Sequence, residues 1–310
     1  MPRVTNFCRC GRAAATVWII SILVFYFLFQ AVMENSKSIH TESLISSSER
    51  RSRLYDKMAR DLDELGMKFL QGGETSQSLS INDIFELRGG SVMLKPKAAD
   101  PPVRANVLYL SPEFSYPISQ AVRDIFLPYF DGAIWFQNAS LYHFSLFHAS
   151  HHLTSVKATD TEIEAEACAV REVAQSLCPL KIFMDRVVLT STGVLLGCWQ
   201  VISGPDPVTI RAKLQNALPH SPEKQLYDPA MLHTSFARIL GHPNVPLEKM
   251  ENSSDLLKFF HELVARVNNK IHGFQATVSE LWFVEEYDVL ALALDGRMKV
   301  RKFPFGCSTH

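Results

Sequence analysis

The sequence predicts an α+β fold, in which two antiparallel sheets with flanking helices follow a transmembrane helix at the N-terminus. Two observations support this prediction. Strand-like and amphipathic helical runs occur in the same order twice within residues 142–294, which indicates an internal duplication. An uncharged apolar run, residues 16–33, is about long enough to cross a bilayer as a helix.

The composition is that of a globular protein. The 310 residues are 47% hydrophobic and 20% charged, which suits one domain of about 200 residues with additional segments. The 31 Lys and Arg residues nearly balance the 32 Asp and Glu residues, and the formal net charge is −1. Because no excess of basic residues indicates a nucleic-acid-binding surface, we expect no DNA partner and only local phosphate recognition.

The apolar run 16–33 is interpreted as an uncleaved signal anchor. A cleaved signal peptide and a buried core helix are the alternatives, but the run exceeds a normal signal-peptide apolar region and Ala31-Val32-Met33 is a poor cleavage site. Three arginines lie in residues 1–15, so the positive-inside rule makes this tail cytosolic and the rest of the chain lumenal. We therefore expect a single-pass type II protein of the endomembrane system, in the Golgi or the endoplasmic reticulum.

Sequons and cysteines agree with a lumenal domain. Asn138 and Asn252 each begin an N-glycosylation triplet, although such triplets also arise by chance. Cys8 and Cys10, next to the anchor on its cytosolic side, are candidates for palmitoylation. The other cysteines are able to form disulfides whose pairing the spacing does not define, and they are Cys168, Cys178, Cys198 and Cys307.

Residues 34–102 are predicted to be a stem. Its first part is polar and rich in serine, and its last part, residues 72–102, has the Ser, Gly and Pro content of a linker. Between them, apolar residues at helical spacing predict a helix over about residues 49–70, namely Leu54, Met58, Leu62, Leu65 and Phe69. We expect this helix to pack against the main domain, and a short coiled coil that forms a weak dimer is the alternative.

The main domain is expected to occupy residues 103–310, after Pro101-Pro102. A strand, a helix and a hairpin are predicted in its first half at residues 142–147, 159–177 and 180–202. The second half repeats this order at residues 231–239, 254–271 and 274–294. The two hairpins are offset by 95 residues (275 − 180) and the two leading strands by 90 (233 − 143).

Each leading strand carries a histidine followed two residues later by a serine, His143 with Ser145 and His233 with Ser235. This spacing places both side chains on one face of a strand. One imidazole of a pair can accept a proton while the other donates one, and hydroxyl groups can hold phosphate oxygens, so the pattern suits phosphoester chemistry. Two histidines bonded to the backbone of a β core are the alternative.

Other residues near the motifs are weaker candidates. We expect His148, His151 and His152 to lie in an exposed loop and not to bind a metal, because no Asp, Glu or Cys is close in sequence. On a regular strand Arg238 faces away from Ser235, which makes it a weak phosphate ligand. Aromatic residues beside the first motif could stack on a base, but we expect most of them in the core: Trp135, Phe136, Tyr142 and Phe147.

The motifs His143-Phe144-Ser145-Leu146 and His233-Thr234-Ser235-Phe236 resemble those of the 2H phosphoesterase superfamily, which includes 2′-5′ RNA ligase-like proteins and cyclic nucleotide phosphodiesterases. Residues 274–290 are similar to the last hairpin of that family, and the resemblance covers roughly residues 105–294. It implies a bilobal, pseudo-twofold fold with one histidine from each lobe in a central cleft. It also implies no metal, no cofactor and the opening of a 2′,3′-cyclic phosphate or a related nucleotide or RNA-end phosphodiester.

The resemblance further implies that one of His143 and His233 activates water while the other protonates the leaving ribose oxygen, with Ser145 and Ser235 on the phosphate. The acidic helix 159–177 has no matching basic patch, so we expect a small nucleotide or an RNA end as the ligand. One alternative is a catalytically inactive module of this fold that binds or scaffolds. Another is an anchored glycosyltransferase. It is disfavoured because the domain is small and its only Asp-x-Asp motif, Asp61-Leu62-Asp63, lies in the predicted stem helix.

Overall fold

The computed structural model describes residues 46–72, 79–88, 91–244 and 253–307. The predicted membrane anchor, Cys8, Cys10 and the sequon at Asn252 lie outside these residues. Among the residues described, no helix combines the length and the apolar character needed to cross a membrane. The chain divides into two compact units, Met1–Glu49 and Arg50–His310, and both the sheets and the site belong to the second.

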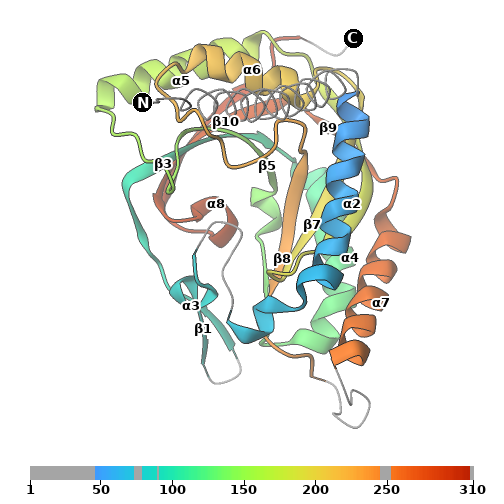
Figure 1. Ribbon diagram of the computed structural model, residues 1–310. Coiled ribbons are helices and arrows are strands. Elements are labelled where there is room, and N and C mark those ends of the chain that lie inside the picture. Colours follow the sequence, from blue (N-terminus) through green and yellow to red (C-terminus); the bar gives the residue numbers. More distant parts are fainter. Residues whose placement is uncertain (1–45, 73–78, 89–90, 245–252, 308–310) are drawn as a thin grey trace, which may run out of the picture. The chain divides into compact units, whose positions relative to one another are not determined.

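Two antiparallel sheets form the framework, which confirms the predicted class of mixed fold (Figure 1). The four-stranded sheet has the order β11-β10-β3-β5, with bounds Met298–Pro304, Glu280–Asp288, Ala98–Tyr109 and His143–Ser150. The five-stranded sheet has the order β4-β8-β7-β6-β9, with bounds Ile134–Phe136, His233–Ile239, Val194–Ser203, Leu180–Leu189 and Gln275–Val278. A separate hairpin consists of β1, Phe85–Arg88, and β2, Ser91–Leu94.

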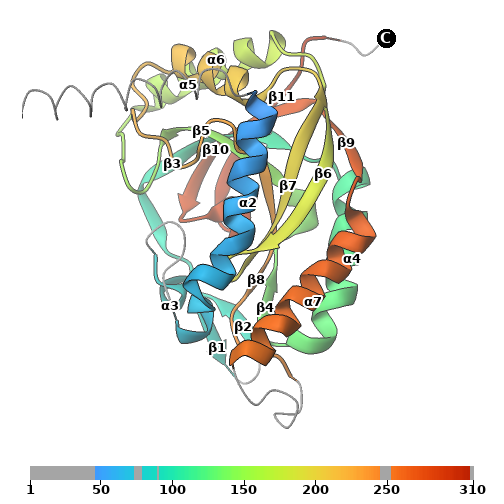
Figure 2. The same cartoon turned by 45° about the vertical axis from the view of Figure 1, so that its right-hand side comes forward.

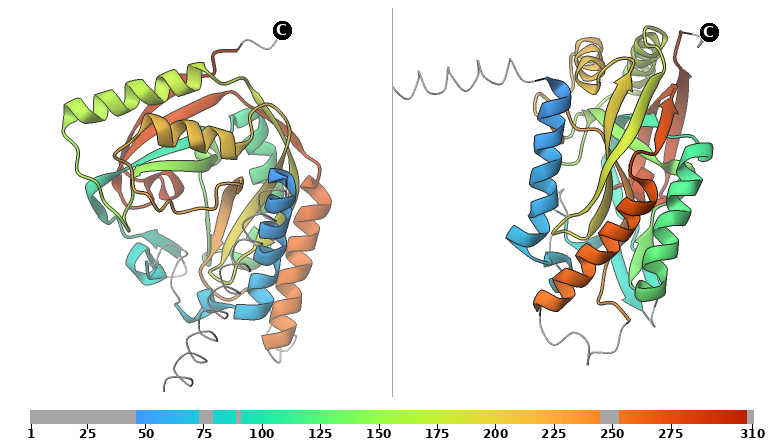
Figure 3. Two further views of the ribbon diagram at one scale, coloured as in Figure 1. Left: turned by 45° about the horizontal axis from the view of Figure 1, so that its top comes forward. Right: turned by 90° about the vertical axis from the view of Figure 1, so that its right-hand side faces the viewer.

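Helices cover both sheets. The longer ones are α2 (Ser47–Leu65), α4 (Pro112–Phe130), α5 (Asp160–Gln175), α6 (Pro207–Ala217) and α7 (Ser253–Ile271). Helices α5 and α6 pack on each other and against the four-stranded sheet, while α4 and α7 lie side by side on the five-stranded sheet (Figure 2). Figure 3 shows α2 on the opposite face of the five-stranded sheet. A short helix, α8 (Ala291–Leu294), follows β10.

Helix α2 packs on the main domain, but its buried face differs from the predicted apolar stripe. Arg51, Tyr55 and Leu62 are buried, whereas Leu65 is 49% exposed. Tyr55 packs with Val188, Val194, Leu196 and Cys198 of the five-stranded sheet. The buried face is set by polar bonds of Arg51 and Tyr55 as well as by apolar contacts, so hydrophobic spacing alone did not identify it.

The predicted closing hairpin of residues 274–284 with 289–294 is wrong. β9 pairs with β6, whereas β10 pairs with β3 and β11, so the chain passes from one sheet to the other at Ser279. β11, which was not predicted, is an edge strand of the four-stranded sheet. Its side chains are exposed or half-buried, so it lacks the apolar alternation that identifies a strand in a sequence.

Residues 72–102, predicted to be linker, contain the short helix α3 (Ile81–Ile84), the β1-β2 hairpin and the start of β3. The predicted start of the domain at residue 103 therefore falls within a strand. Pro101 and Pro102 are tolerated there because the pairing of β3 with β10 is irregular between Glu286 and Asp288, and proline is found at such bulges.

Cysteines and the described sequon have distinct environments. Cys178 and Cys307 form a disulfide across 129 residues of sequence, while Cys168 is exposed and Cys198 is buried. The exposed Asn138 begins a short 3-10 helix, in which its side-chain oxygen accepts a hydrogen bond from the Ser140 amide. The aromatic residues beside the first motif lie in the core or against it, as predicted, and are Trp135, Phe136, Tyr142 and Phe147.

Candidate active site

The four residues predicted to form a site line one cavity of about 440 Å³. His143 and Ser145 come from β5 of the four-stranded sheet, and His233 and Ser235 come from β8 of the five-stranded sheet. The tertiary structure thus brings together two motifs that are 90 residues apart (233 − 143).

Both motif strands contain a bulge directly after the serine. In β5, Ser145 pairs with Val107 and Phe147 with Asn106, so Leu146 is the extra residue. In β8, Ser235 pairs with Leu196 and Ala237 with Leu195, so Phe236 is the extra residue. An extra residue shifts the alternation of the side chains that follow by one position.

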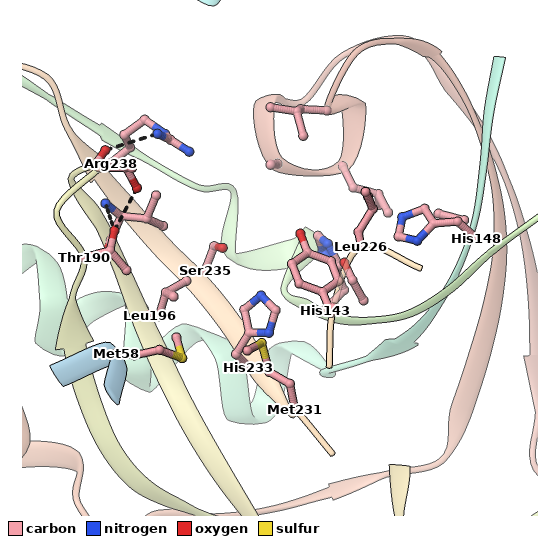
Figure 4. Close-up of a pocket in the computed structure, with 18 of the residues that line it drawn as sticks. Met58, His143, His148, Thr190, Leu196, Leu226, Met231, His233, Ser235 and Arg238 are labelled. Carbon is pink, nitrogen blue, oxygen red and sulfur yellow. Dashed lines mark hydrogen bonds between the residues drawn. The ribbon is translucent and has the colours of Figure 1, made fainter. Parts of the chain in front are cut away.

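The bulges bring two further basic side chains into the cavity. His148 and Arg238 each stand five residues after a motif histidine, and both line the cavity. The prediction that Arg238 faces away from Ser235 is therefore wrong, because it assumed a regular strand. The prediction that His148 lies in an exposed loop is also wrong, because β5 extends through this residue. Figure 4 shows Arg238 and His148 toward opposite ends of the cavity, with the two motif histidines between them.

His143 has a defined tautomer when its imidazole is neutral. Its Nδ1 lies 2.8 Å from the carbonyl oxygen of Leu141, and because a carbonyl only accepts, Nδ1 carries the proton. Nε2 is then unprotonated. Burial lowers the pKa of the His143 imidazole, and the bond to Leu141 partly offsets that effect.

His233 is 9% exposed, and its Nδ1 has no hydrogen-bond partner among the described residues. Burial, together with the nearby charges of Arg211 and His143, lowers the pKa of His233 to about 3. Both motif histidines are therefore neutral near pH 7 when the site is empty. An anion bound between them would stabilise an imidazolium, so phosphate binding should be coupled to proton uptake.

Arg238 is a partly buried cation with a single hydrogen bond among the described residues, from Nη1 to the Thr192 carbonyl oxygen at 3.3 Å. None of the described carboxylates forms an ion pair with it. Burial lowers the pKa of Arg238 to about 10, which leaves it charged near neutral pH. A partly buried guanidinium that lines the same cavity as the two serines, and that pairs with none of the described carboxylates, is suited to an anionic ligand.

Arg211 of α6 joins the first motif strand to the segment that leads into the second, and no feature of the sequence had indicated it. Its guanidinium donates to the carbonyl oxygens of Leu146 at 2.9 Å and Ser145 at 3.1 Å in the first motif strand. It also donates to Met231 at 2.8 Å and to Pro229, just before the second motif. One buried cation therefore holds the backbone of the first motif and of the segment just before the second.

Helix α2 forms one wall of the cavity and supports the second motif. Its side chains in the cavity are Leu54, Lys57, Met58 and Asp61. The Tyr55 hydroxyl lies 2.8 Å from the carbonyl oxygen of Trp199 and 2.7 Å from that of Leu232, and it accepts from the Leu232 amide at 3.2 Å. Since Leu232 immediately precedes His233, α2 helps to position that histidine.

Glu286 of β10 brings a buried carboxyl group to the cavity. It is 7% exposed and accepts a hydrogen bond from the Leu292 amide at 2.7 Å. Burial raises the pKa of Glu286 to about 7.

Within the described part of the chain, no cluster of His, Cys, Asp and Glu is arranged to hold a metal ion. His151 uses both ring nitrogens on the backbone, at Lys224 and Thr154.

No family model and no curated protein sequence matches the chain. Among solved structures, it is similar to LigT of E. coli in its apo form, with a TM-score of 0.40 and 12% identity over 68% of this chain and 98% of that one. TT0787 of Thermus thermophilus gives a TM-score of 0.42 and 12% identity, covering 66% and 98%. LigT of E. coli complexed with 3′-AMP gives 0.39 and 14%, covering 68% and 99%. The chain is thus similar in structure to LigT, and the function proposed for it rests on its own residues.

Proposed function

We propose that this protein is a phosphodiesterase that opens 2′,3′-cyclic phosphates, or related nucleotide or RNA-end phosphodiesters, by acid–base catalysis with His143 and His233. One observation carries the proposal. Two histidines from different sheets, each followed by a serine and then by a basic side chain placed by a bulge, line the same cavity. This is the set of groups that a phosphodiester needs for attack on one side and release on the other.

The tautomer of His143 makes it the base. Its unprotonated Nε2 accepts a proton from water, and the water oxygen forms a bond to phosphorus. The bond from phosphorus to one ribose oxygen breaks, and protonated His233 donates its proton to that oxygen. The product is a phosphomonoester with a free ribose hydroxyl. His233 obtains its proton when the anionic substrate binds, because the negative charge raises the pKa that burial lowers in the empty site.

Three groups are proposed to hold the phosphate. The hydroxyls of Ser145 and Ser235 donate to its non-bridging oxygens, and the guanidinium of Arg238 compensates its charge. The size of the cavity, about 440 Å³, suits a small nucleotide or the end of an RNA chain. The formal net charge of −1 agrees with a small ligand, since a long RNA requires an extended basic surface.

The type II topology and the lumenal placement of the domain are also part of the proposal, and the sequence at residues 1–33 supports them. In cells, enzymatic removal of N-glycans should increase gel mobility, and Asn138→Gln should abolish part of that shift. Access of a cytosolic protease to the domain in sealed membranes would contradict this topology.

The activity is tested on the full-length protein in detergent, with nucleoside 2′,3′-cyclic phosphates and EDTA present. His143→Gln and His233→Gln should each lower kcat by about 10² to 10⁴ with folding intact by circular dichroism. Turnover that survives in either variant, or that EDTA abolishes, would contradict the two-histidine mechanism. Nucleotide binding without any turnover would instead favour the inactive binding module.

A further inference from the structure

The end of the cavity beside the four-stranded sheet contains two polar groups that the proposed phosphodiester chemistry does not use. His148 is 6% exposed and Glu286 is 7% exposed, and both line the cavity. The ring nitrogens of His148 have no hydrogen bond to other described residues. Glu286 has one, from the Leu292 amide, and none of the described cations pairs with it. Buried polar groups that open on a cavity in this way are suited to a ligand.

Small side chains separate these two groups. His148 pairs with Ala105 across β5 and β3, and Glu286 pairs with Val103 across β10 and β3. The two Cα atoms are therefore two strands and two residues apart, which corresponds to roughly 12 Å at ordinary strand spacing. Ala105 and Val103 form the apolar floor between them. Such a span admits a flat bicyclic ring whose two edges reach the polar groups.

Residues around α8 line the same cavity, and Leu292 packs in one apolar cluster with Val103 and Ala105. Leu290, Leu292 and Ala293 line the cavity there, and Leu290 holds a left-handed conformation with φ of 59°. That conformation is uncommon for a residue with a branched side chain. The Leu292 amide bond to Glu286 fixes this segment to β10. The result is a slot with apolar faces and polar ends.

We infer that this slot is a nucleobase subsite that selects guanine, with Glu286 at the Watson–Crick edge of the base and His148 at the edge nearer the phosphate. The inference rests on the proposed phosphodiesterase function. The catalytic pair lies between Arg238 and His148 (Figure 4), so a phosphate held between the histidines directs its nucleoside toward this end.

Guanine fits the ionised form of Glu286 better than adenine or cytosine does. An ionised carboxylate only accepts hydrogen bonds, and guanine presents N1–H and a 2-amino group as adjacent donors. Burial raises the pKa of Glu286 to about 7, and the hydrogen bond from the Leu292 amide opposes that shift, so the carboxyl group is ionised, and accepts from guanine, above about pH 7. Adenine and cytosine place an acceptor beside their amino group, so an ionised carboxylate meets a repulsive lone pair.

The test compares kcat/KM of the full-length protein for the 2′,3′-cyclic phosphates of guanosine, inosine, adenosine and cytidine. We expect guanosine to exceed inosine, which lacks the 2-amino group, by about tenfold or more. Glu286→Gln should bring the guanosine to inosine ratio close to one. Glu262→Gln on the exposed face of α7 is the matched control and should keep the wild-type ratio.

His148→Leu should raise KM for the guanosine substrate by about tenfold, and an unchanged KM would remove His148 from the subsite. Equal kcat/KM for all four substrates would overturn the subsite and leave the phosphodiesterase standing. If no substrate is opened, the proposed function fails, and calorimetric binding of guanosine and inosine 3′-monophosphates tests the subsite separately. Equal affinity for these two ligands would overturn it.

Discussion

Arg211 donates a hydrogen bond to the carbonyl oxygen of Ser145 at 3.1 Å, and the same nitrogen donates to the carbonyl oxygen of Met231 at 2.8 Å. One guanidinium therefore links the first motif strand to the segment just before the second motif strand. Lysine retains the charge but lacks the planar fork that reaches several carbonyl groups. We expect Arg211→Lys to lower the free energy of unfolding by about 3 kcal/mol and to reduce kcat/KM.

Urea unfolding and cyclic-phosphate kinetics measure these two effects. Arg60→Lys, at a site on α2 that is 61% exposed, is the control and should change neither quantity appreciably. An Arg211→Lys variant with the stability and kinetics of the wild type would show that this bond set does not position the motifs.

Tyr55→Phe removes one hydroxyl and leaves the carbonyl oxygens of Trp199 and Leu232 without that partner. We expect a loss of about 1–3 kcal/mol in unfolding free energy, because buried polar groups lose a bond. Because Leu232 precedes His233, kcat should fall more than KM rises. Thermal unfolding and steady-state kinetics measure this, with the 55% exposed Tyr116→Phe as the control. Equal behaviour of the two variants would contradict a role for α2 at the site.

Gly197→Ala should destabilise the second motif strand. A Cβ at Gly197 would lie 2.2 Å from Cζ of Phe236, the extra residue of the β8 bulge. Overpacking of this kind costs about 1–3 kcal/mol. Phe236→Leu should recover part of the loss in the double variant, which a double-mutant cycle in urea would detect. Strictly additive effects would rule out this contact as the cause.

Acid should destabilise the protein through its buried histidines. Burial is the main cause that lowers the pKa of His148 and of His233 to about 3, against about 6.5 in an unfolded chain. Between these values the unfolded chain binds more protons than the folded protein. The contribution of these histidines to the free energy of unfolding is therefore complete above about pH 6.5 and is lost as the pH decreases toward 3. Urea unfolding at several pH values measures this dependence, and His148→Leu should reduce the slope of unfolding free energy against pH by about 1.4 kcal/mol per pH unit. An unchanged slope would contradict this origin.

Several features of the fold and the site were predictable from local sequence patterns. The histidine and serine pairs at positions 143, 145, 233 and 235 line one cavity, as their two-residue spacing on apolar strands suggested. The antiparallel sheets and most helices follow from alternation and helical periodicity, which depend only on near neighbours in the chain. The order of strand, helix and hairpin was predictable in the first half for the same reason, whereas the hairpin predicted to close the second half does not form.

Only the tertiary structure decided which further side chains join the motifs. A bulge depends on the partner strand, so the pairings at Leu146 and Phe236 alone bring His148 and Arg238 into the cavity. The hydrogen bonds from Arg211 and Tyr55 to backbone carbonyl oxygens join segments that are far apart in sequence. At Ser279 the chain passes from one sheet to the other, so β9 and β10 belong to different sheets. The sequence by itself identified the two histidine and serine pairs, because their spacing is local, whereas long-range strand pairing and side-chain bonds determined which other residues surround them.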